Sequence, residues 1–246
     1  MLRKILIAPL LLSSVLSAQI AIVNAASFAT NQGVTAGSWA AAFGTFTGIT
    51  TTTAPAPPFP TLLAGVRLSV GGIDAPLYDV RASQITFLIP AGVASGLQNV
   101  VLTTSTGTTN GTVRVVSAAP GIFVKDTANP PKGAILNQTG LENTSALPAA
   151  RGEVISIYGT GPGAFNATYV DGTAPGFSPL ISTKSTPQVF FSGVEAEVKY
   201  TGLNPSSPGL WQINVVIPNR SFITGRVPVS VFIDGVDSNQ VTVFVQ

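Results

Sequence analysis

Histidine and cysteine, which most often carry nucleophilic and zinc chemistry, do not occur in this chain of 246 residues. Their absence excludes Ser-His-Asp and Cys-His catalysis and the usual zinc sites. Glycoside hydrolysis remains open in principle, but it requires two carboxylates with separate protonation roles. Only Glu195 and Glu197 lie close together on one predicted strand face, and an internal repeat replaces the second with Pro76. The sequence therefore predicts a protein that is not an enzyme and needs no cofactor.

Oxygen ligands for a calcium ion are the next chemistry that the sequence offers. The stretch DGVDSN at 234–239 contains Asp234, Asp237 and Asn239, whose carboxylate and amide oxygens suit Ca²⁺. An Asp-Gly pair between two apolar runs is also a strong signal for a hairpin turn. We therefore expect a turn and no metal, with a cation site at these three residues as the alternative.

Aromatic residues in the two longest irregular segments offer contacts for a ligand. These segments, 47–61 and 165–187, are rich in Thr and Pro and contain Phe59, Tyr169 and Phe177. Loops at the end of a β-sandwich are common binding positions, and exposed aromatic rings stack well on sugars. We predict Phe59, Tyr169 and Phe177 as binding residues, and the alternative is that the three rings fold back on the sheet.

The elements that must position these residues are short strands. The chain contains 25 Gly and 19 Pro, only 9% charged residues, and much Thr, Ser and Val. This composition is typical of strands joined by tight turns. In QITFLIP at 84–90 and QINVVIP at 212–218, isoleucines alternate with other residues before a proline ends the run. A period of two predicts that each strand buries its isoleucines on one face.

Four blocks of sequence occur twice in the same order. GSWAAAFGT at 37–45 matches GEVISIYGT at 152–160, and VGGIDAPLY at 70–78 matches FSGVEAEVK at 191–199. QITFLIP precedes QINVVIP by 128 residues, and TSTGTTNGTVRVV at 104–116 precedes FIDGVDSNQVTVF at 232–244 by the same distance. The separation between the paired blocks grows along the chain, which indicates a duplication with insertions in loops. We predict an all-β protein of two tandem immunoglobulin-like sandwiches, with one closed barrel as the alternative.

The predicted organisation has four parts. Residues 1–18 are a signal peptide, because Arg3 and Lys4 precede an apolar run that is too short to span a bilayer. The first sandwich spans 19–116 and the second spans 151–246. Segment 117–150 contains two apolar runs, so we expect an ordered hairpin or strap that joins the two domains.

Removal of the signal peptide leaves 12 − 2 = 10 basic and 10 acidic residues, and hence no net formal charge. A neutral chain with few charges has no basic face to follow phosphates, so we expect no nucleic-acid partner. No internal run reaches transmembrane length, so we expect no membrane span in the mature chain.

Several quoted motifs together carry a resemblance to a known family. They are NAASF at 24–28, the GSW…FGT strand, the two Gln-Ile…Pro phrases, APGIF at 119–123, GAILNQ at 133–138 and SPGLWQINVVIP at 207–218. With these motifs the chain resembles the Solibacter C-terminal family, a β domain of secreted acidobacterial proteins. Each half is more distantly similar to an IPT/TIG immunoglobulin-like domain. The resemblance implies export and a β-sandwich, and it implies no specific activity.

These observations predict an exported protein located outside the cell, in the periplasm or at the cell surface. Its expected role is non-enzymatic: adhesion, matrix assembly or protein docking, with an extracellular protein or glycan as partner. Two alternatives remain at this point. One is a carbohydrate-binding protein that uses the aromatic loops, and the other is a C-terminal sorting or anchoring domain.

Overall fold

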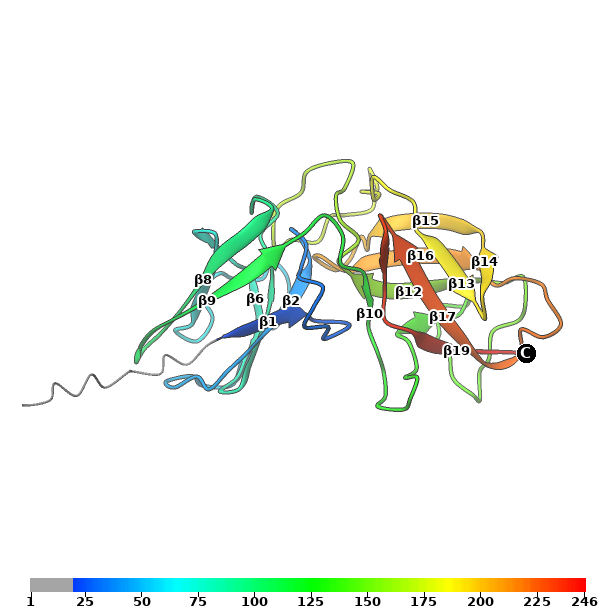
Figure 1. Ribbon diagram of the computed structural model, residues 1–246, viewed down its shortest axis with the longest axis horizontal. Coiled ribbons are helices and arrows are strands. Elements are labelled where there is room, and N and C mark those ends of the chain that lie inside the picture. The colour runs from blue at the N-terminus through cyan, green and yellow to red at the C-terminus, as the bar shows by residue number, and fades with distance from the viewer. Residues whose placement is uncertain (1–19) are drawn as a thin grey trace, which may run out of the picture.

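The protein consists of two β-sandwiches that lie side by side (Figure 1). The computed structural model describes residues 20–246, so the predicted signal peptide lies outside the described residues. This part of the chain contains 19 strands and no helix, and it therefore includes no helix that could cross a bilayer. The prediction of an all-β fold with tandem immunoglobulin-like sandwiches is confirmed.

The first sandwich packs a five-stranded sheet, ordered β1-β2-β7-β6-β3, on a four-stranded sheet, ordered β5-β4-β8-β9. All pairings between these strands are antiparallel. Strands of the first sheet are β1 (Ala21–Asn24), β2 (Trp39–Phe43), β7 (Gln84–Leu88), β6 (Leu77–Val80) and β3 (Thr52–Thr53). Strands of the second sheet are β5 (Ile73–Asp74), β4 (Arg67–Val70), β8 (Gly96–Thr104) and β9 (Gly107–Val115).

The second sandwich packs two five-stranded sheets. One has the order β10-β12-β16-β15, with β11 also paired to β12, and the other has the order β14-β13-β17-β18, with β19 also paired to β17. Strands of the first are β10 (Gly121–Ile122), β11 (Ile135–Leu136), β12 (Val154–Thr160), β16 (Trp211–Val216) and β15 (Val198–Leu203). Strands of the second are β14 (Val194–Ala196), β13 (Gln188–Phe191), β17 (Gly225–Ile233), β18 (Val236–Asp237) and β19 (Val241–Val245).

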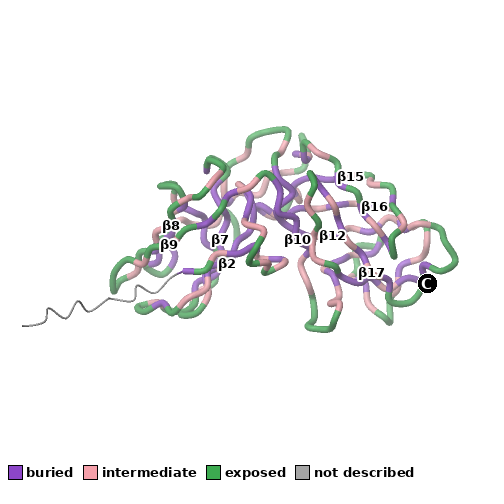
Figure 2. Tube along the Cα trace, in the orientation of Figure 1, coloured by how far each residue is buried: buried purple, intermediate pink, exposed green. Residues whose placement is uncertain are grey.

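Each sandwich has its own hydrophobic core, as the two buried regions in Figure 2 show. Ile85 and Phe87 of β7 point into the first core, and Ile213 and Val215 of β16 point into the second. The first core gathers residues between Ile20 and Val115. The intervening residues of both strands face outward, as a period of two requires. The two copies of the Gln-Ile…Pro phrase are thus equivalent strands of separate cores.

The duplication extends to an irregularity in the backbone. Strand β6 pairs with β7 with a register shift between Leu77 and Asp79, and β15 pairs with β16 with a shift between Val198 and Tyr200. Each shift is a β-bulge, in which one extra residue has no partner on the opposite strand. Both bulges fall at the same position of the aligned blocks.

Segment 117–150, which we expected to join the domains as a strap, belongs to the second sandwich. Its strands β10 and β11 both pair with β12, and Ile122 and Ile135 lie in the second core. Ile135 pairs with Ile157 of β12, and Ile22 of β1 pairs with Ala42, the residue of β2 that aligns with Ile157 in the repeat. Strand β11 is therefore the counterpart of β1. Strand β11 has only two residues, too few for an alternating pattern that would identify it as a strand of the second sandwich in the sequence.

Candidate functional site

The junction between the sandwiches is braced by a long loop. The loop between β12 and β13, residues 161–187, extends from the second sandwich over the first (Figure 1). We call it the bracing loop. Both carboxylate oxygens of Asp171 accept the backbone N–H of Ala91, at 3.1 and 3.0 Å, and the carbonyl of Gly172 accepts the N–H of Phe59 at 2.9 Å. Burial raises the pKa of Asp171, although the Ala91 N–H acts in the opposite direction.

Buried hydrogen bonds join the sandwiches at a second place. The side-chain amide of Asn24 donates to the carbonyl of Ala119 at 2.7 Å. The backbone N–H of Trp39 donates to the hydroxyl of Thr160 at 2.7 Å, and its indole N–H donates to the carbonyl of Pro208 at 3.0 Å. Buried polar groups that are paired in this way hold a single geometry, because a small rotation would break these bonds before water could replace them. The angle between the two sandwiches is therefore fixed.

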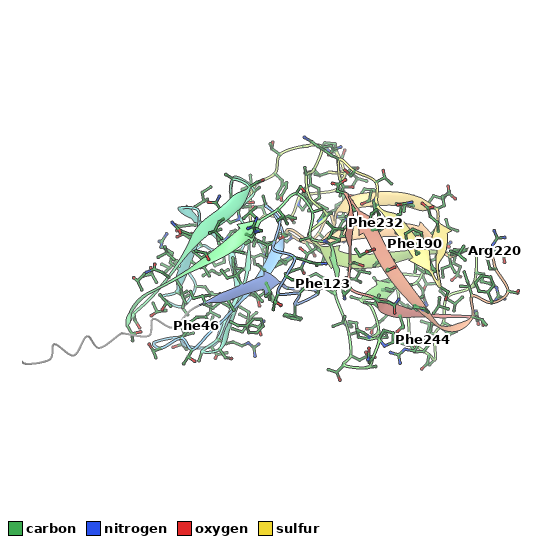
Figure 3. The ribbon with its side chains drawn as sticks, viewed as in Figure 1. Phe46, Phe123, Phe190, Arg220, Phe232 and Phe244 are labelled. Carbon is green, nitrogen blue, oxygen red and sulfur yellow. The ribbon has the colours of Figure 1, made fainter. Side chains whose placement is uncertain are left out.

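A pocket of about 400 Å³ lies at this fixed junction. Trp39, Phe59 and Tyr78 of the first sandwich form one wall, and their rings pack edge to face with centroids 5.5–5.7 Å apart. The second sandwich supplies the opposite wall, formed by Phe123, Ser206, Ser207, Pro208 and Leu210. Figure 3 shows Phe123 between the two sandwiches. We call this space the junction pocket.

Tyr78 reaches the junction pocket because of the bulge in β6. Its neighbours Leu77 and Asp79 are buried, whereas Tyr78 is the extra residue of the bulge and is 40% exposed. Bulges are frequent beside functional sites because they redirect one side chain. Here the bulge turns a tyrosine ring out of the sheet and against Trp39 and Phe59.

A second hollow of about 270 Å³ continues the junction pocket across the second sandwich. Phe123 and Leu210 line both spaces, and Tyr158 of β12 lies further along. We call this space the sheet pocket. Its charged groups form one cluster, in which Glu142 lies 2.6 Å from Lys132 and 3.6 Å from Lys125, so that one positive charge is left over. The hydrogen bond from Lys132 is the main reason that the pKa of Glu142 is lowered.

The three predicted aromatic contacts do not form one cluster. Phe59 lines the junction pocket. Tyr169 packs edge to face on Phe165, and its hydroxyl is buried with no hydrogen-bond partner among the described residues; burial raises the pKa of Tyr169. Phe177 is 75% exposed at the surface of the bracing loop. Their role in binding stays a prediction.

Asp234, Asp237 and Asn239 lie at and after the turn between β17 and β18. Asp234 has a positive φ of 49° at the turn. The Asn239 side chain donates to the carbonyl of Ile122 and accepts its N–H, at 3.0 and 2.8 Å. This amide is therefore occupied in anchoring β10. Among the described residues, no group of three or more carboxylates, histidines or cysteines is placed to hold a metal ion.

Trp39, Tyr78 and Phe123 were not predicted as site residues. Trp39 and Pro208 are far apart in the sequence, and nothing in either segment indicates that they meet. One signal was present in the sequence: where the first copy has Tyr78, the aligned block of the second copy has Lys199. Because the second copy has a charged residue at this position, the position does not have to be buried. An aromatic residue there in the first copy suggests a role at the surface.

No protein-family model matches this chain, and the search of curated proteins finds no match. Solved structures are similar to it at low identity. One is the Bacteroides ovatus protein SGBP-B of a mixed-linkage glucan utilization locus, in complex with a mixed-linkage heptasaccharide, at 16% identity and a TM-score of 0.35. This match covers 87% of this chain and 43% of that chain, so our chain spans less than half of its length.

Tandem immunoglobulin domains of titin are also similar. One titin tandem matches at 11% identity with a TM-score of 0.24, over 94% of this chain and 97% of that chain. A structure of titin A168169 matches at 14% identity with a TM-score of 0.26, over 87% of this chain and 93% of that chain. Similarities at this level assign no ligand, and the resemblance to the Solibacter C-terminal family stays a prediction.

Proposed function

We propose that this protein is an exported, non-enzymatic binding module that holds an extracellular ligand in the junction pocket. The observation that carries the proposal is the aromatic wall of Trp39, Phe59 and Tyr78. A wall from the other sandwich faces it, and the pocket between the two walls has a volume of about 400 Å³. Concave, mostly apolar spaces with a few polar groups are the usual form of a ligand site.

The rigidity of the junction supports a binding role. Trp39 forms part of the pocket wall and is also hydrogen-bonded to Thr160 and Pro208 of the second sandwich. Such a site is already ordered before the ligand arrives, so association does not have to order it. Both sandwiches contribute residues to the pocket, so neither copy of the repeat would form the site alone.

The chemistry of the pocket supports a binding role and not a catalytic one. Its polar side chains are the indole N–H of Trp39 and the hydroxyls of Tyr78, Thr86, Ser206 and Ser207, and no carboxylate or lysine of the described chain lines it. General acid–base catalysis mostly uses His, Asp, Glu or Lys side chains, and none of these is among the described residues that line the pocket. Export is part of the proposal and depends on the predicted signal peptide.

The proposal is tested by binding of the purified mature chain to immobilised extracellular polysaccharides and proteins from the source envelope. We expect Tyr78→Ala to abolish binding of the ligand, because this ring is exposed in the pocket and its removal leaves the core intact. Phe222→Ala is the matched control, because Phe222 is 60% exposed in a loop at the far end of the second sandwich. Ligand capture that is unaffected by Tyr78→Ala but is abolished by Phe177→Ala would place the site on the bracing loop and overturn the proposal.

A further inference from the structure

We infer that the junction pocket and the sheet pocket together bind a linear, uncharged polysaccharide. The inference rests on the proposed function and gives it a ligand class. Phe123 and Leu210 line both spaces, so the two pockets adjoin, and we treat them as one groove from the aromatic wall of the first sandwich to β12 of the second. A site of this shape suits an extended chain better than a compact ligand.

The apolar part of the groove suits the C–H faces of sugar rings. Tyr78 presents a ring that is 40% exposed and is held at a fixed orientation by its contacts with Trp39 and Phe59. Phe123 and Tyr158 continue the aromatic surface onto the second sandwich. Tyrosine combines an apolar ring face with a hydroxyl, so it can contact both the C–H groups and the hydroxyls of a sugar.

A row of side-chain amides lies beside Tyr158 and suits the hydroxyl groups of a sugar. Gln212 of β16 is the cross-strand partner of Tyr158, and both side chains face outward from the sheet. The Gln212 amide accepts a hydrogen bond from Asn204 at 2.8 Å and donates one to Asn214 at 2.8 Å. Ser156 donates to the same oxygen of Asn214 at 3.0 Å. We call Asn204, Gln212 and Asn214 the amide row.

The hydrogen bonds within the amide row fix the direction of the N–H groups that are not used in them. The Asn214 oxygen receives two hydrogen bonds, whereas the described residues provide no acceptor for its N–H groups. Amides that are oriented in this way can donate to ligand hydroxyls without losing further side-chain freedom. A sugar chain lying along Tyr158 would meet this row on one side.

The charge of the groove favours an uncharged polymer. Among the described residues, no charged side chain lines the junction pocket, and in the sheet pocket one carboxylate, Glu142, lies between two lysines, which leaves a single positive charge. A polyanion would need unpaired cations, and a polycation would need unpaired carboxylates. The described part of the groove has one positive charge in excess and no free carboxylate, so it lacks the series of charges that a polyanion or a polycation would require.

The backbone beside the groove disfavours a peptide strand as the ligand. Peptides often add to a sheet through the free backbone groups of an edge strand. Strand β12 is paired on one side with β10 and β11 and on the other side with β16, and β16 is also paired with β15. The groove therefore crosses strands whose backbone groups are already satisfied, and recognition must use side chains.

The experiment is affinity electrophoresis of the mature chain in gels that contain hydroxyethylcellulose, mixed-linkage β-glucan, galactomannan or dextran, with polygalacturonate as the anionic comparison. We expect at least one neutral polysaccharide to retard the protein and polygalacturonate not to. Tyr78→Ala should weaken binding about tenfold or more, as loss of a central aromatic contact does, and Gln212→Ala should weaken it about tenfold, as loss of one or two hydrogen bonds does. Phe222→Ala should migrate like the unmodified protein.

Calorimetry with oligosaccharides of increasing length separates the two pockets. We expect affinity to rise from the disaccharide to the hexasaccharide of the retarding polymer, and Gln212→Ala to remove this rise while disaccharide binding is kept. If Tyr78-dependent binding is found only with a protein, a peptide or polygalacturonate, the junction pocket is a binding site but the polysaccharide inference is overturned. If no tested polymer or envelope protein binds in a Tyr78-dependent manner, the proposed function fails as well.

Discussion

The indole N–H of Trp39 donates a hydrogen bond to the carbonyl oxygen of Pro208 at 3.0 Å, and this bond links the two sandwiches through the wall of the junction pocket. Trp39→Phe removes the donor and keeps an aromatic ring. We expect a loss of about 1–3 kcal/mol in the free energy of unfolding, because the buried Pro208 carbonyl loses its partner. Denaturant unfolding measures the loss, and hydrogen exchange should show faster exchange around 204–210. Unchanged exchange there would contradict a role for this bond in holding the junction.

Ile85 and Ile213 occupy equivalent positions in two separate cores. Truncation of either one to alanine should cost about 2–5 kcal/mol, because each leaves a cavity in a packed interior. Hydrogen exchange should assign the loss of protection from Ile85→Ala to the first sandwich and that from Ile213→Ala to the second. Equal loosening of both sandwiches by Ile85→Ala would show that the two cores behave as one unit.

Trp211 fills the second core, and the repeat has Ser83 at its counterpart position. Trp211 is fully buried, and its indole N–H donates to Thr201 at 2.9 Å, whereas Ser83 is exposed. Trp211→Ala should therefore destabilise the second sandwich by about 3–5 kcal/mol. Ser83→Ala is the matched control in the first copy, and its unfolding midpoint should stay within experimental error of the unmodified protein.

Asp171 should make the junction less stable as the pH rises. Its pKa is raised in the folded protein from the ordinary value of 3.8, chiefly by burial, so the folded state holds the proton more tightly than the unfolded state. Stability from this group is fully present below pH 3.8 and is lost as the pH rises through the raised pKa. Asp171→Asn keeps an acceptor for the Ala91 N–H but cannot ionise. Unfolding curves across this window should therefore show a smaller decline for Asp171→Asn, and parallel curves would contradict the assignment.

Gly161 lies where the strap approaches the bracing loop, and it has a positive φ of 78°. A Cβ at this position would overlap the carbonyl of Ala119, which is the acceptor of the Asn24 amide. Gly176 is a matched control, because it has a φ of 89° and open space around the same position. Both alanine variants bear the backbone strain of a left-handed conformation, about 1–2 kcal/mol, and Gly161→Ala should lose substantially more stability because main-chain atoms must also move. Similar thermal midpoints for the two variants would contradict this packing.

The sequence was sufficient to predict the strands and the duplication, because both are written in local patterns. The period of two around Ile85 and Ile213 identifies the faces that form the cores, and the Asp-Gly pair at Asp234 identifies a turn. The candidate site depends on contacts between distant segments. Trp39 meets Pro208, and Phe59 meets Gly172, only after the sandwiches have packed together.

Phe59 could be proposed as a contact residue from the sequence because it lies in an irregular segment, where an aromatic residue is conspicuous, and its role in binding stays a prediction. Tyr78 was not, because its exposure depends on a bulge, and a bulge leaves no signature in a single sequence. Strand β11 was assigned to a separate strap because it has only two residues, Ile135 and Leu136, which is too short for a periodic pattern.

The paired bulges of β6 and β15 have a consequence for how the two copies diverged. The first bulge presents Tyr78, and the second presents Lys199, which is paired with Glu197 at 2.5 Å. Both copies contain the bulge, but the residue that the bulge exposes differs between them. Such a position can acquire a new specificity without any change to the core beneath it. Lys199 is therefore the natural place to engineer a second recognition surface into this scaffold.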